Sequence, residues 1–555
     1  MLLHPPSGGP PATTMSSLDE KSPNMSAEKV DADAYDVEVQ SSQARPEEQL
    51  KRQLKDRHIA MISIGGVIGT GLFVGTANAL TNAGPIGLLL GYIVTGSLCY
   101  TMMISLGEMV SYLPIAGGHI TLAGRFVDPA FSFTLGWMYW YNWVLVLPAE
   151  LSAVGVLMQY WHPPVTGAVW IVVCLVVVIT INLFGAGVYG ECEFIFASIK
   201  IIAIVGLIIL GIILDLGGVT GDRLGFRYWL DPGPFVQFNG ISGSWGRFLG
   251  FWRTLIVSAG AYIGTEIVAI AAAETKNPRR NLPRAIKRIY IRIILFYICG
   301  VIIVGLLVPS NDPRVNLGGS DASASPFVIA IERAGIKALP SIINAVLVSA
   351  AWSAASSDLY TSSRALYGLA AAGNAPKIFL RTTKHGLPWV SVGFCAMFSA
   401  LAFMTLSTSA GQVFTWFQNL CGVAGLLTWF GSSITYIRFY NGMKAQGIDR
   451  STLPYRSPFQ PYAAYYAAAL SGVIVLFSGW TTFLHGNWDT ATFVTNYFGL
   501  AAFPIMFIGA KLWRRTKFVG VHEMDFTTGL KEIDEADVLM EPPKTWIGRV
   551  WRALM

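Results

Sequence analysis

The sequence predicts an all-α integral membrane protein with about twelve transmembrane helices. The chain has 555 residues, of which 53% are hydrophobic and only 13% charged, whereas soluble domains carry about 25% charged residues. Its mean hydropathy is +0.51, and its apolar residues come in runs of roughly 20, the length that crosses a bilayer as a helix. The expected spans are 58–78, 84–111, 131–160, 167–187, 191–214, 248–273, 288–309, 339–358, 388–408, 413–440, 461–484 and 491–513.

Two polar tails flank a transmembrane domain expected over 53–515. Within the first tail, 1–52, the first 50 residues hold nine acidic and three basic residues and are rich in Ser and Pro, which predicts disorder. The tail has no apolar run of the kind that signal peptides use, so the first span is expected to act as the targeting signal. The second tail, 516–555, ends in TWIGRVWRALM, which predicts either a short amphipathic helix on the membrane surface or a mobile end.

Basic residues predict the orientation of the spans. They gather before the first span and in the loops after the sixth and eighth, while the short loops after the third, ninth and eleventh have none. Because loops rich in Lys and Arg stay in the cytosol, both tails are expected to be cytosolic. The residues concerned are Lys51, Arg52, Lys55, Arg57, Lys276, Arg279, Arg280, Arg284, Lys287, Arg288, Arg292, Arg364, Lys377, Arg381 and Lys384. We attribute the net charge of +6 to this topology and expect no binding of nucleic acid.

Residues that carry enzyme or metal chemistry are sparse. The six cysteines lie within or beside spans at no metal-ligand spacing, and we expect them to pack as small apolar side chains. The sequence has no Gly-rich phosphate loop, and we interpret His119 as a loop histidine rather than a triad member. We therefore expect no enzymatic activity, no metal and no cofactor.

A glycine-rich signature occurs twice. Residues 63–71 read SIGGVIGTG and residues 258–266 read SAGAYIGTE, so five of the nine positions match. The first copy lies in span one and the second in span six, which cross the membrane in opposite directions. This is the mark of an inverted repeat of five helices. The repeats are expected over about 58–214 and 248–440, with two further helices at about 461–513.

Clustered glycines favour a break in each of these two spans, because glycine costs a helix interior about 1 kcal/mol relative to alanine. A broken helix inside a membrane leaves backbone groups unpaired, which is tolerated only where they line a cavity. The freed N–H groups suit a carboxylate and the freed carbonyls suit an ammonium, so two such breaks would bind a zwitterion. The alternative is close helix packing through the GxxxG pair Gly65 and Gly69, which the paired occurrence disfavours.

These motifs resemble the fungal amino acid permeases of the amino acid–polyamine–organocation superfamily. The resemblance runs over roughly residues 50–520. It implies the LeuT-like, five-plus-five inverted-repeat fold with broken helices 1 and 6 and two extra helices. It also implies proton-driven import of L-amino acids at the plasma membrane. The matching motifs are 65-GGVIGTGLFVGTA-77, 107-GEMVSYLPIAGG-118, 148-PAELSA-153, 264-GTEIVAIAAAETKNPRRNLPRAIKR-288 and 356-SSDLYTSSRALYGLA-370.

Carried over by position, the resemblance implies a substrate site at the two breaks. Gly69, Thr70 and Gly71 would meet the substrate carboxylate, the carbonyls of Ile68, Gly260 and Ile263 would receive the ammonium, and Tyr262 would form an aromatic wall or gate. The complete expected set is Gly66, Ile68, Gly69, Thr70, Gly71, Gly260, Tyr262, Ile263, Gly264 and Thr265.

Three charged residues inside spans predict the coupling machinery, since such groups are costly unless they are paired or functional. In relatives, a lysine at the position of Lys200 takes the place of a sodium ion and would contact the broken first helix, which favours proton coupling. Glu150 and Glu266 are then candidate proton carriers; alternatively, they pair with Lys200 or cap backbone groups. Outside the spans, Glu108, Asp358 and Arg364 are expected to form an inner gate held by ion pairs.

Three functional alternatives remain at this stage. The first is proton-coupled uptake, with neutral amino acids, including proline, favoured because Ala259, Gly260 and Ala261 are small and add no charge. The second is a sensor that binds an amino acid without transporting it, and the third is a carrier of polyamines or other amines. By the same resemblance, Lys21 and Lys29 are candidate ubiquitination sites for ligase adaptors. Palmitoylation of the C-terminal tail is not expected because that tail has no cysteine.

Overall fold

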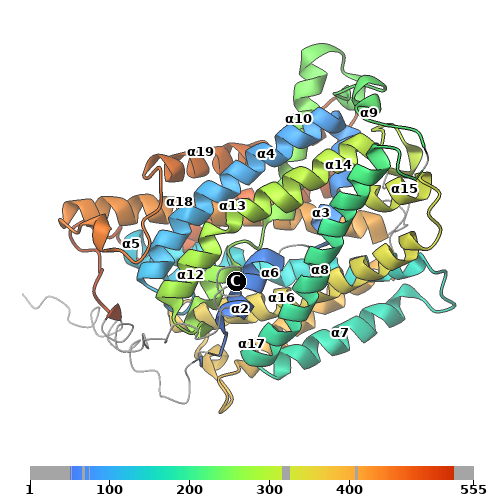
Figure 1. Cartoon of the computed structure of the whole chain (residues 1–555). Helices are drawn as coiled ribbons and strands as arrows, with labels where there is room; N and C mark the ends of the chain where they lie inside the picture. Colours follow the sequence, from blue (N-terminus) through green and yellow to red (C-terminus); the bar gives the residue numbers. More distant parts are fainter. Residues whose placement is uncertain are drawn as a thin grey trace, which may run out of the picture. The chain divides into compact units, whose positions relative to one another are not determined.

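Helices form nearly all the regular structure of the chain (Figure 1). The computed structural model describes residues 50–51, 53–65, 69–73, 75–219, 221–315, 325–406 and 410–530, all of which belong to one unit, Arg45–Met555. Within these residues the only β pairing is an isolated bridge between Leu54 and Thr275.

The first repeat begins with an interrupted span. Helix α2 (Asp56–Gly65) ends before α3 (Thr70–Phe73) begins, and α4 (Gly75–Tyr112) follows. Helix α4 bends at Gly84, where φ is +75° and a Cβ would lie 2.8 Å from the carbonyl oxygen of Pro234. Spans one and two therefore meet at a sharp turn with almost no loop. The repeat continues with α5 (His119–Phe126), α6 (Pro129–Gln159), α7 (Gly167–Leu183) and α8 (Ala186–Asp215).

The second repeat also begins with an interrupted span, α10 (Gly243–Tyr262) followed by α11 (Ile267–Ile270) and η5 (Ala271–Glu274). Its seventh span passes through a π-helical stretch, and its eighth, α16 (Leu339–Ala371), extends 13 residues beyond the predicted end. The remaining elements of this repeat are α12 (Pro278–Lys287), α13 (Ile289–Arg292), η6 (Ile293–Ile298), α14 (Cys299–Leu307), α15 (Pro326–Arg333), α17 (Trp389–Met397), η10 (Phe398–Leu406) and α18 (Ala410–Ala445). Two further helices, α19 (Tyr462–Leu476) and α20 (Thr490–Arg514), complete the bundle.

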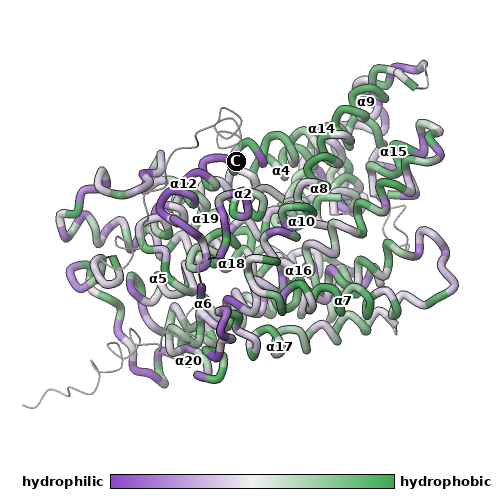
Figure 2. The backbone as a smooth tube through the Cα atoms, turned by 60° about the horizontal axis from the view of Figure 1, so that its bottom comes forward, coloured by the Kyte–Doolittle hydropathy of each residue, from purple (hydrophilic) through white to green (hydrophobic). Residues whose placement is uncertain are grey.

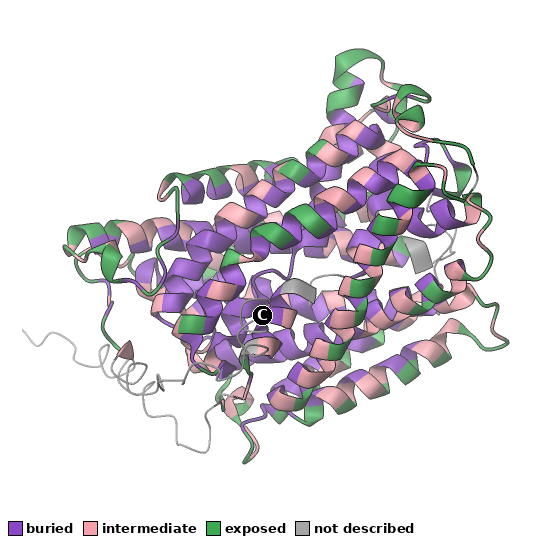
Figure 3. Cartoon of the chain, viewed as in Figure 1, coloured by how far each residue is buried: buried purple, intermediate pink, exposed green. Residues whose placement is uncertain are grey.

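The described helices confirm the predicted class of all-helical membrane protein. Nine of them are long and apolar enough to cross a bilayer, and two shorter apolar helices lie at 167–183 and 389–405. Hydrophobic residues run along α7 and α14 (Figure 2), and many large apolar side chains of α7, α8 and α20 are exposed, as expected of a surface that faces lipid. Residues around α2 and α6 are mostly buried, whereas the short helix α9 (Arg227–Leu230) has no buried residue (Figure 3).

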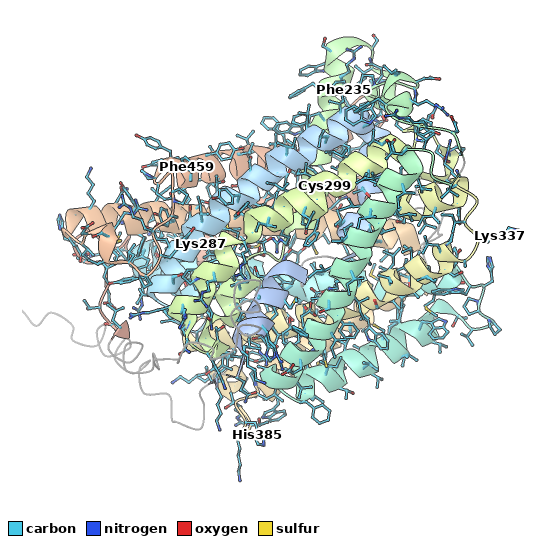
Figure 4. The ribbon with its side chains drawn as sticks, in the orientation of Figure 1. Phe235, Lys287, Cys299, Lys337, His385 and Phe459 are labelled. Atoms are coloured by element: carbon cyan, nitrogen blue, oxygen red, sulfur yellow. The ribbon has the colours of Figure 1, made fainter. Side chains whose placement is uncertain are left out.

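Packing places α6 at the centre of the bundle, against both α16 and α18. The interrupted helix α10 packs mainly on α4, and α2 packs on α8. Polar side chains such as Lys337 and His385 project from loops at the edge of the molecule, while Cys299 is the first residue of α14 (Figure 4). The breaks in the first and sixth spans therefore face the central helices rather than lipid.

The segment after α20, predicted as a tail, packs against the bundle as far as it is described. The Val519 N–H donates to the Val127 carbonyl at 3.0 Å, and the Gln446 side chain donates to the Met524 carbonyl at 2.9 Å. Phe526 is buried with its ring centroid 5.1 Å from that of Phe126. Residues 519–530, which we name the C-terminal strap, thereby connect the ends of α5 and α18.

Candidate functional site

The sixth span breaks at the residues that the sequence indicated. Helix α10 ends at Tyr262, Ile263 leaves the helical region with ψ of 140°, and Gly264 has φ of +104°, a conformation that favours glycine. The Glu266 carboxylate accepts hydrogen bonds from the Gly264 N–H at 3.2 Å and from Trp429 Nε1 at 3.2 Å. The Thr265 hydroxyl donates to the Tyr262 carbonyl at 2.7 Å. Side chains thus satisfy part of the backbone that the break exposes.

In the first span Gly69 is not helical and lies directly before α3, and this part of the span approaches the second break. A Cβ placed on Gly69 would lie 3.0 Å from Glu150 Oε1, and one placed on Gly71 would lie 3.3 Å from the Ala261 Cα. Such contacts are too close for most side chains, so these glycines allow the interrupted span to approach both α6 and α10. Gly66 and Ile68 lie outside the described residues, as does the side chain of Thr70.

A cavity of about 60 Å³ lies where the two breaks meet α6, α16 and α18. Two carboxylates, Glu150 and Asp358, and the amide of Gln418 give it polar walls, while Trp143 and Phe417 give it aromatic ones. No Lys or Arg is among the described residues that line it. The complete lining is Gly69, Gly71, Trp143, Val146, Ala149, Glu150, Gly260, Ala261, Ile263, Ala354, Asp358, Phe417, Gln418 and Cys421.

The cavity brings together several predicted site residues. Gly69, Gly71, Gly260 and Ile263, which were expected to bind substrate, line it together with Glu150. Gly264, Thr265 and Glu266 belong to the break of the sixth span, but they do not line the cavity. Their side chains and N–H groups instead bond to one another and to α18, as described above.

Tyr262 requires a correction, because it does not form the wall of this cavity. Its hydroxyl donates to the Tyr92 carbonyl at 3.1 Å, and its ring stacks on Tyr297 with centroids 4.3 Å apart. As the last residue of α10, it points toward α4 and the seventh span. The aromatic residues at the cavity are Trp143 and Phe417, from α6 and α18.

Lys200 is fully buried in α8, where its ammonium lies 3.7 Å from Glu193 Oε1. Glu193 also accepts a hydrogen bond from the Ser353 hydroxyl at 2.7 Å, so this pair connects α8 to α16. The expected contacts of Lys200 with the carbonyls of the first break involve residues 66–68, which the structure does not describe. Its role in coupling therefore stays a prediction.

The three expected gate residues lie inside helices rather than in loops, which corrects their predicted location. Asp358 is in α16 and lines the cavity, because this helix continues well past the predicted end of the span. Arg364 forms its ion pair with Glu274 at 3.5 Å, rather than with Asp358.

Glu108 is buried near the end of α4 and accepts two hydrogen bonds from Arg450, both at 2.8 Å. It also accepts one from the Ser457 N–H at 2.8 Å. Glu108 therefore ties α4 to the loop between α18 and α19. Whether these pairs act as a gate stays a prediction.

Sequence reasoning missed four residues of this region. Three of them line the cavity from α6 and α18: Trp143, Phe417 and Gln418. The sequence does not show which face of these helices turns toward the cavity. A polar amide inside an apolar span, such as Gln418, could still have indicated a functional position. Arg292 was counted among loop residues, yet it is buried in α13 and contacts both interrupted spans. Its position inside the predicted span 288–309 was the signal that could have identified it.

Comparison with known proteins identifies the family. The amino acid permease family model matches residues 58–523. The chain is 43% identical over 511 residues to a proline-specific permease of Emericella nidulans, covering 90% of this chain and 92% of that protein. It is 42% identical over 501 residues to the proline-specific permease of Saccharomyces cerevisiae, covering 88% and 79%. It is 40% identical over 522 residues to the lysine-specific permease of that yeast, covering 94% and 85%.

The fold also matches a solved transporter. The crystal structure of a mutant of the Eremococcus coleocola manganese transporter superposes with a TM-score of 0.55 at 13% identity, covering 82% of this chain and 93% of that one. At this identity the likeness concerns the fold alone. The family match over most of the chain confirms the resemblance drawn from the glycine-rich motifs. The chain is a multi-pass membrane protein that belongs to the amino acid permease family.

Proposed function

We propose that this chain is a proton-coupled symporter that imports L-amino acids across the plasma membrane, with both termini in the cytosol. The observation that carries the proposal is the cavity between the two interrupted spans, with Glu150 and Asp358 in its wall. Asp358 Oδ2 is buried and has no hydrogen-bond partner in the described part of the chain. A buried carboxylate of this kind needs either a proton or a cationic group, and an amino acid offers an ammonium.

The proposed binding mode follows from the lining. The substrate ammonium would meet the carboxylates and the carbonyls of Gly260 and Ile263. The substrate carboxylate would meet backbone N–H groups around Gly69 and Gly71, where the absence of side chains leaves the backbone open. The break in a half-helix supplies groups of both polarities at one point, which suits a zwitterion.

Proton coupling is assigned to a buried carboxylate close to this site. Glu150 lines the cavity, so its protonation would be sensed directly by a bound substrate. Glu266 is tied to Gly264 and Trp429 at the break, so its protonation would change how the sixth span is held. Either residue fits the role. Lys200 would act as the fixed cation that makes sodium unnecessary.

Neutral substrates, including proline, are favoured. The cavity is small, its apolar wall comes from Trp143, Val146 and Phe417, and none of the described lining residues is cationic, which disfavours a second substrate carboxylate. The similarity to proline-specific permeases supports the same choice, although relatives named for lysine and for dicarboxylic amino acids are about equally similar. Regulation by ubiquitin-ligase adaptors at Lys21 and Lys29 belongs to the same proposal.

The test is uptake of a labelled amino acid panel in a permease-deficient cell, with and without an uncoupler and with sodium replaced by choline. We expect uptake of proline or another neutral amino acid that the uncoupler abolishes and that sodium replacement leaves unchanged. If both Glu150→Gln and Glu266→Gln keep proton-coupled uptake, neither acid carries the proton. If the protein reaches the plasma membrane but takes up nothing, the sensor hypothesis replaces transport.

A further inference from the structure

Arg292 is a buried cation at the junction of the two interrupted spans. It ends the short helix α13 in the seventh span, and only 1% of its side chain is exposed. One guanidinium nitrogen, Nη1, donates to the Ser63 carbonyl on α2, and the other, Nη2, donates to the Thr265 hydroxyl in the break of the sixth span. A single side chain thus contacts both of the spans that form the cavity.

The two contacts have the same electrostatic character. Ser63 lies near the end of the described part of α2 (Asp56–Gly65), and Gly69, the next described residue, is not helical. Thr265 in turn donates to the carbonyl of Tyr262, the last residue of α10. The guanidinium therefore contacts the described end of α2 directly and the C-terminal end of α10 through a hydroxyl. Helix C-termini carry partial negative charge and attract cations.

Converging half-helix C-terminal ends are the kind of place where transporters of this architecture bind a coupling cation. In this protein the positive charge at that place belongs to the Arg292 side chain of the seventh span and is not a bound ion. The third donor of the side chain, Nε, is buried and has no hydrogen-bond partner among the described residues. Arg292 thus has unused bonding capacity at the point where the two interrupted spans meet, so a different set of contacts is open to it when those spans separate.

We infer that Arg292 is a resident cation of the transport machinery, which holds α2 and the end of α10 together in this structure and releases one of them during the transport cycle. This inference rests on the proposed transport function and deepens it. Arg292 is a positioning residue, because it lines neither the cavity nor a proton path. It would hold a second fixed positive charge in the bundle, beside the one proposed for Lys200, at a point where an exchangeable cation could otherwise bind.

Three variants test the inference, together with a control. Arg292→Gln removes the charge, Arg292→Lys keeps the charge without the two-pronged geometry, and Thr265→Val removes only the connection to α10. Arg253→Gln is the matched control, because it removes a guanidinium from α10 whose buried Nη1 has no hydrogen-bond partner among the described residues. Uptake of labelled substrate is measured as KM and Vmax and normalised to the protein at the cell surface.

We expect Vmax to fall about tenfold or more in Arg292→Gln, because the variant loses hydrogen bonds made by a charged group. The KM should change much less. Arg292→Lys and Thr265→Val should fall between this variant and the parent, and Arg253→Gln should match the parent. Adding sodium or guanidinium ions should restore part of the uptake of Arg292→Gln only, because an exchangeable cation can then enter the vacated position. A side chain needed only for folding would not produce this response.

Unchanged Vmax in Arg292→Gln would overturn the inference, as would a loss that follows surface abundance alone and ignores added cations. If Arg292→Gln does not reach the surface, Thr265→Val decides: parental Vmax in that variant would equally count against the inference. An inactive parent protein would instead refute the proposed transport function, so the two failures are distinguishable.

Discussion

Replacing Gly69 by alanine should specifically damage substrate binding. A Cβ at this position would lie 3.0 Å from Glu150 Oε1 and 3.6 Å from the Cβ of Ala354, inside a cavity of only about 60 Å³. We attribute the expected cost to the contact with the Glu150 carboxylate. Overpacking by one methyl group costs about 1–3 kcal/mol, which corresponds to a rise in KM of about 5- to 150-fold.

The assay is uptake of the preferred labelled amino acid over a range of concentrations, with surface abundance measured in parallel. Gly75→Ala is the matched control, because it adds the same methyl group close by, where the nearest atom is a Val257 methyl at an ordinary 3.8 Å. We expect the control to keep the parental KM. A parental KM in Gly69→Ala would mean that substrate does not occupy this cavity and would refute the placement of the site.

Three further predictions concern the parts that hold the bundle together. Glu108→Gln should reduce the amount of mature protein at the cell surface, because breaking the buried ion pair with Arg450 costs about 3–5 kcal/mol. Immunoblots of surface fractions measure this amount. An Arg450→Gln variant that matures normally would contradict the prediction. Phe526→Ala should lower the free energy of unfolding of the purified protein by about 3 kcal/mol, whereas Phe518→Ala, at a side chain 58% exposed, should not. Hydrogen bonds from the Arg314 side chain lower the pKa of Asp312 from its ordinary 3.8 to about 2. The stabilisation from Asp312 is therefore present above pH 3.8 and lost as the pH falls toward 2, so the difference in melting temperature between Asp312→Asn and the parent should close over that interval.

The interrupted spans could be predicted because their cause is local. Glycine lowers the stability of a helix at its own position, and the same nine-residue signature in both halves indicated two such places. The structure confirms the break at Gly264, and in the first span it places Gly69 outside a helix, while residues 66–68 lie outside the described residues. The family could be predicted for the same reason, since its motifs are short and contiguous.

The composition of the cavity could not be predicted, because it depends on which faces of α6, α16 and α18 turn inward. The eighth span was predicted to end at 358, and Asp358 was expected in an inner gate outside the spans. In the structure α16 runs on to Ala371 and buries its second half against α6. Tyr262 was misassigned because it is the last residue of α10. The sequence does not show in which direction a side chain points at the end of an interrupted helix.

The distribution of buried charge explains why this cavity, rather than another buried acidic position, should bind a cation. Elsewhere in the described bundle, four buried acids face basic partners: Glu108 with Arg450, Asp128 with Lys511, Glu193 with Lys200 and Glu274 with Arg364. The buried Glu266 instead accepts hydrogen bonds from the Gly264 N–H and from Trp429. Asp358 has no ion pair of this kind in the described residues, and one of its oxygens is buried without a hydrogen bond. Because an isolated carboxylate is expensive inside a membrane protein, it must be protonated or must face a bound cationic group. In the proposed function Asp358 would face the substrate ammonium, so Asp358→Asn should raise the KM for uptake of the labelled amino acid, and a parental KM would contradict this role.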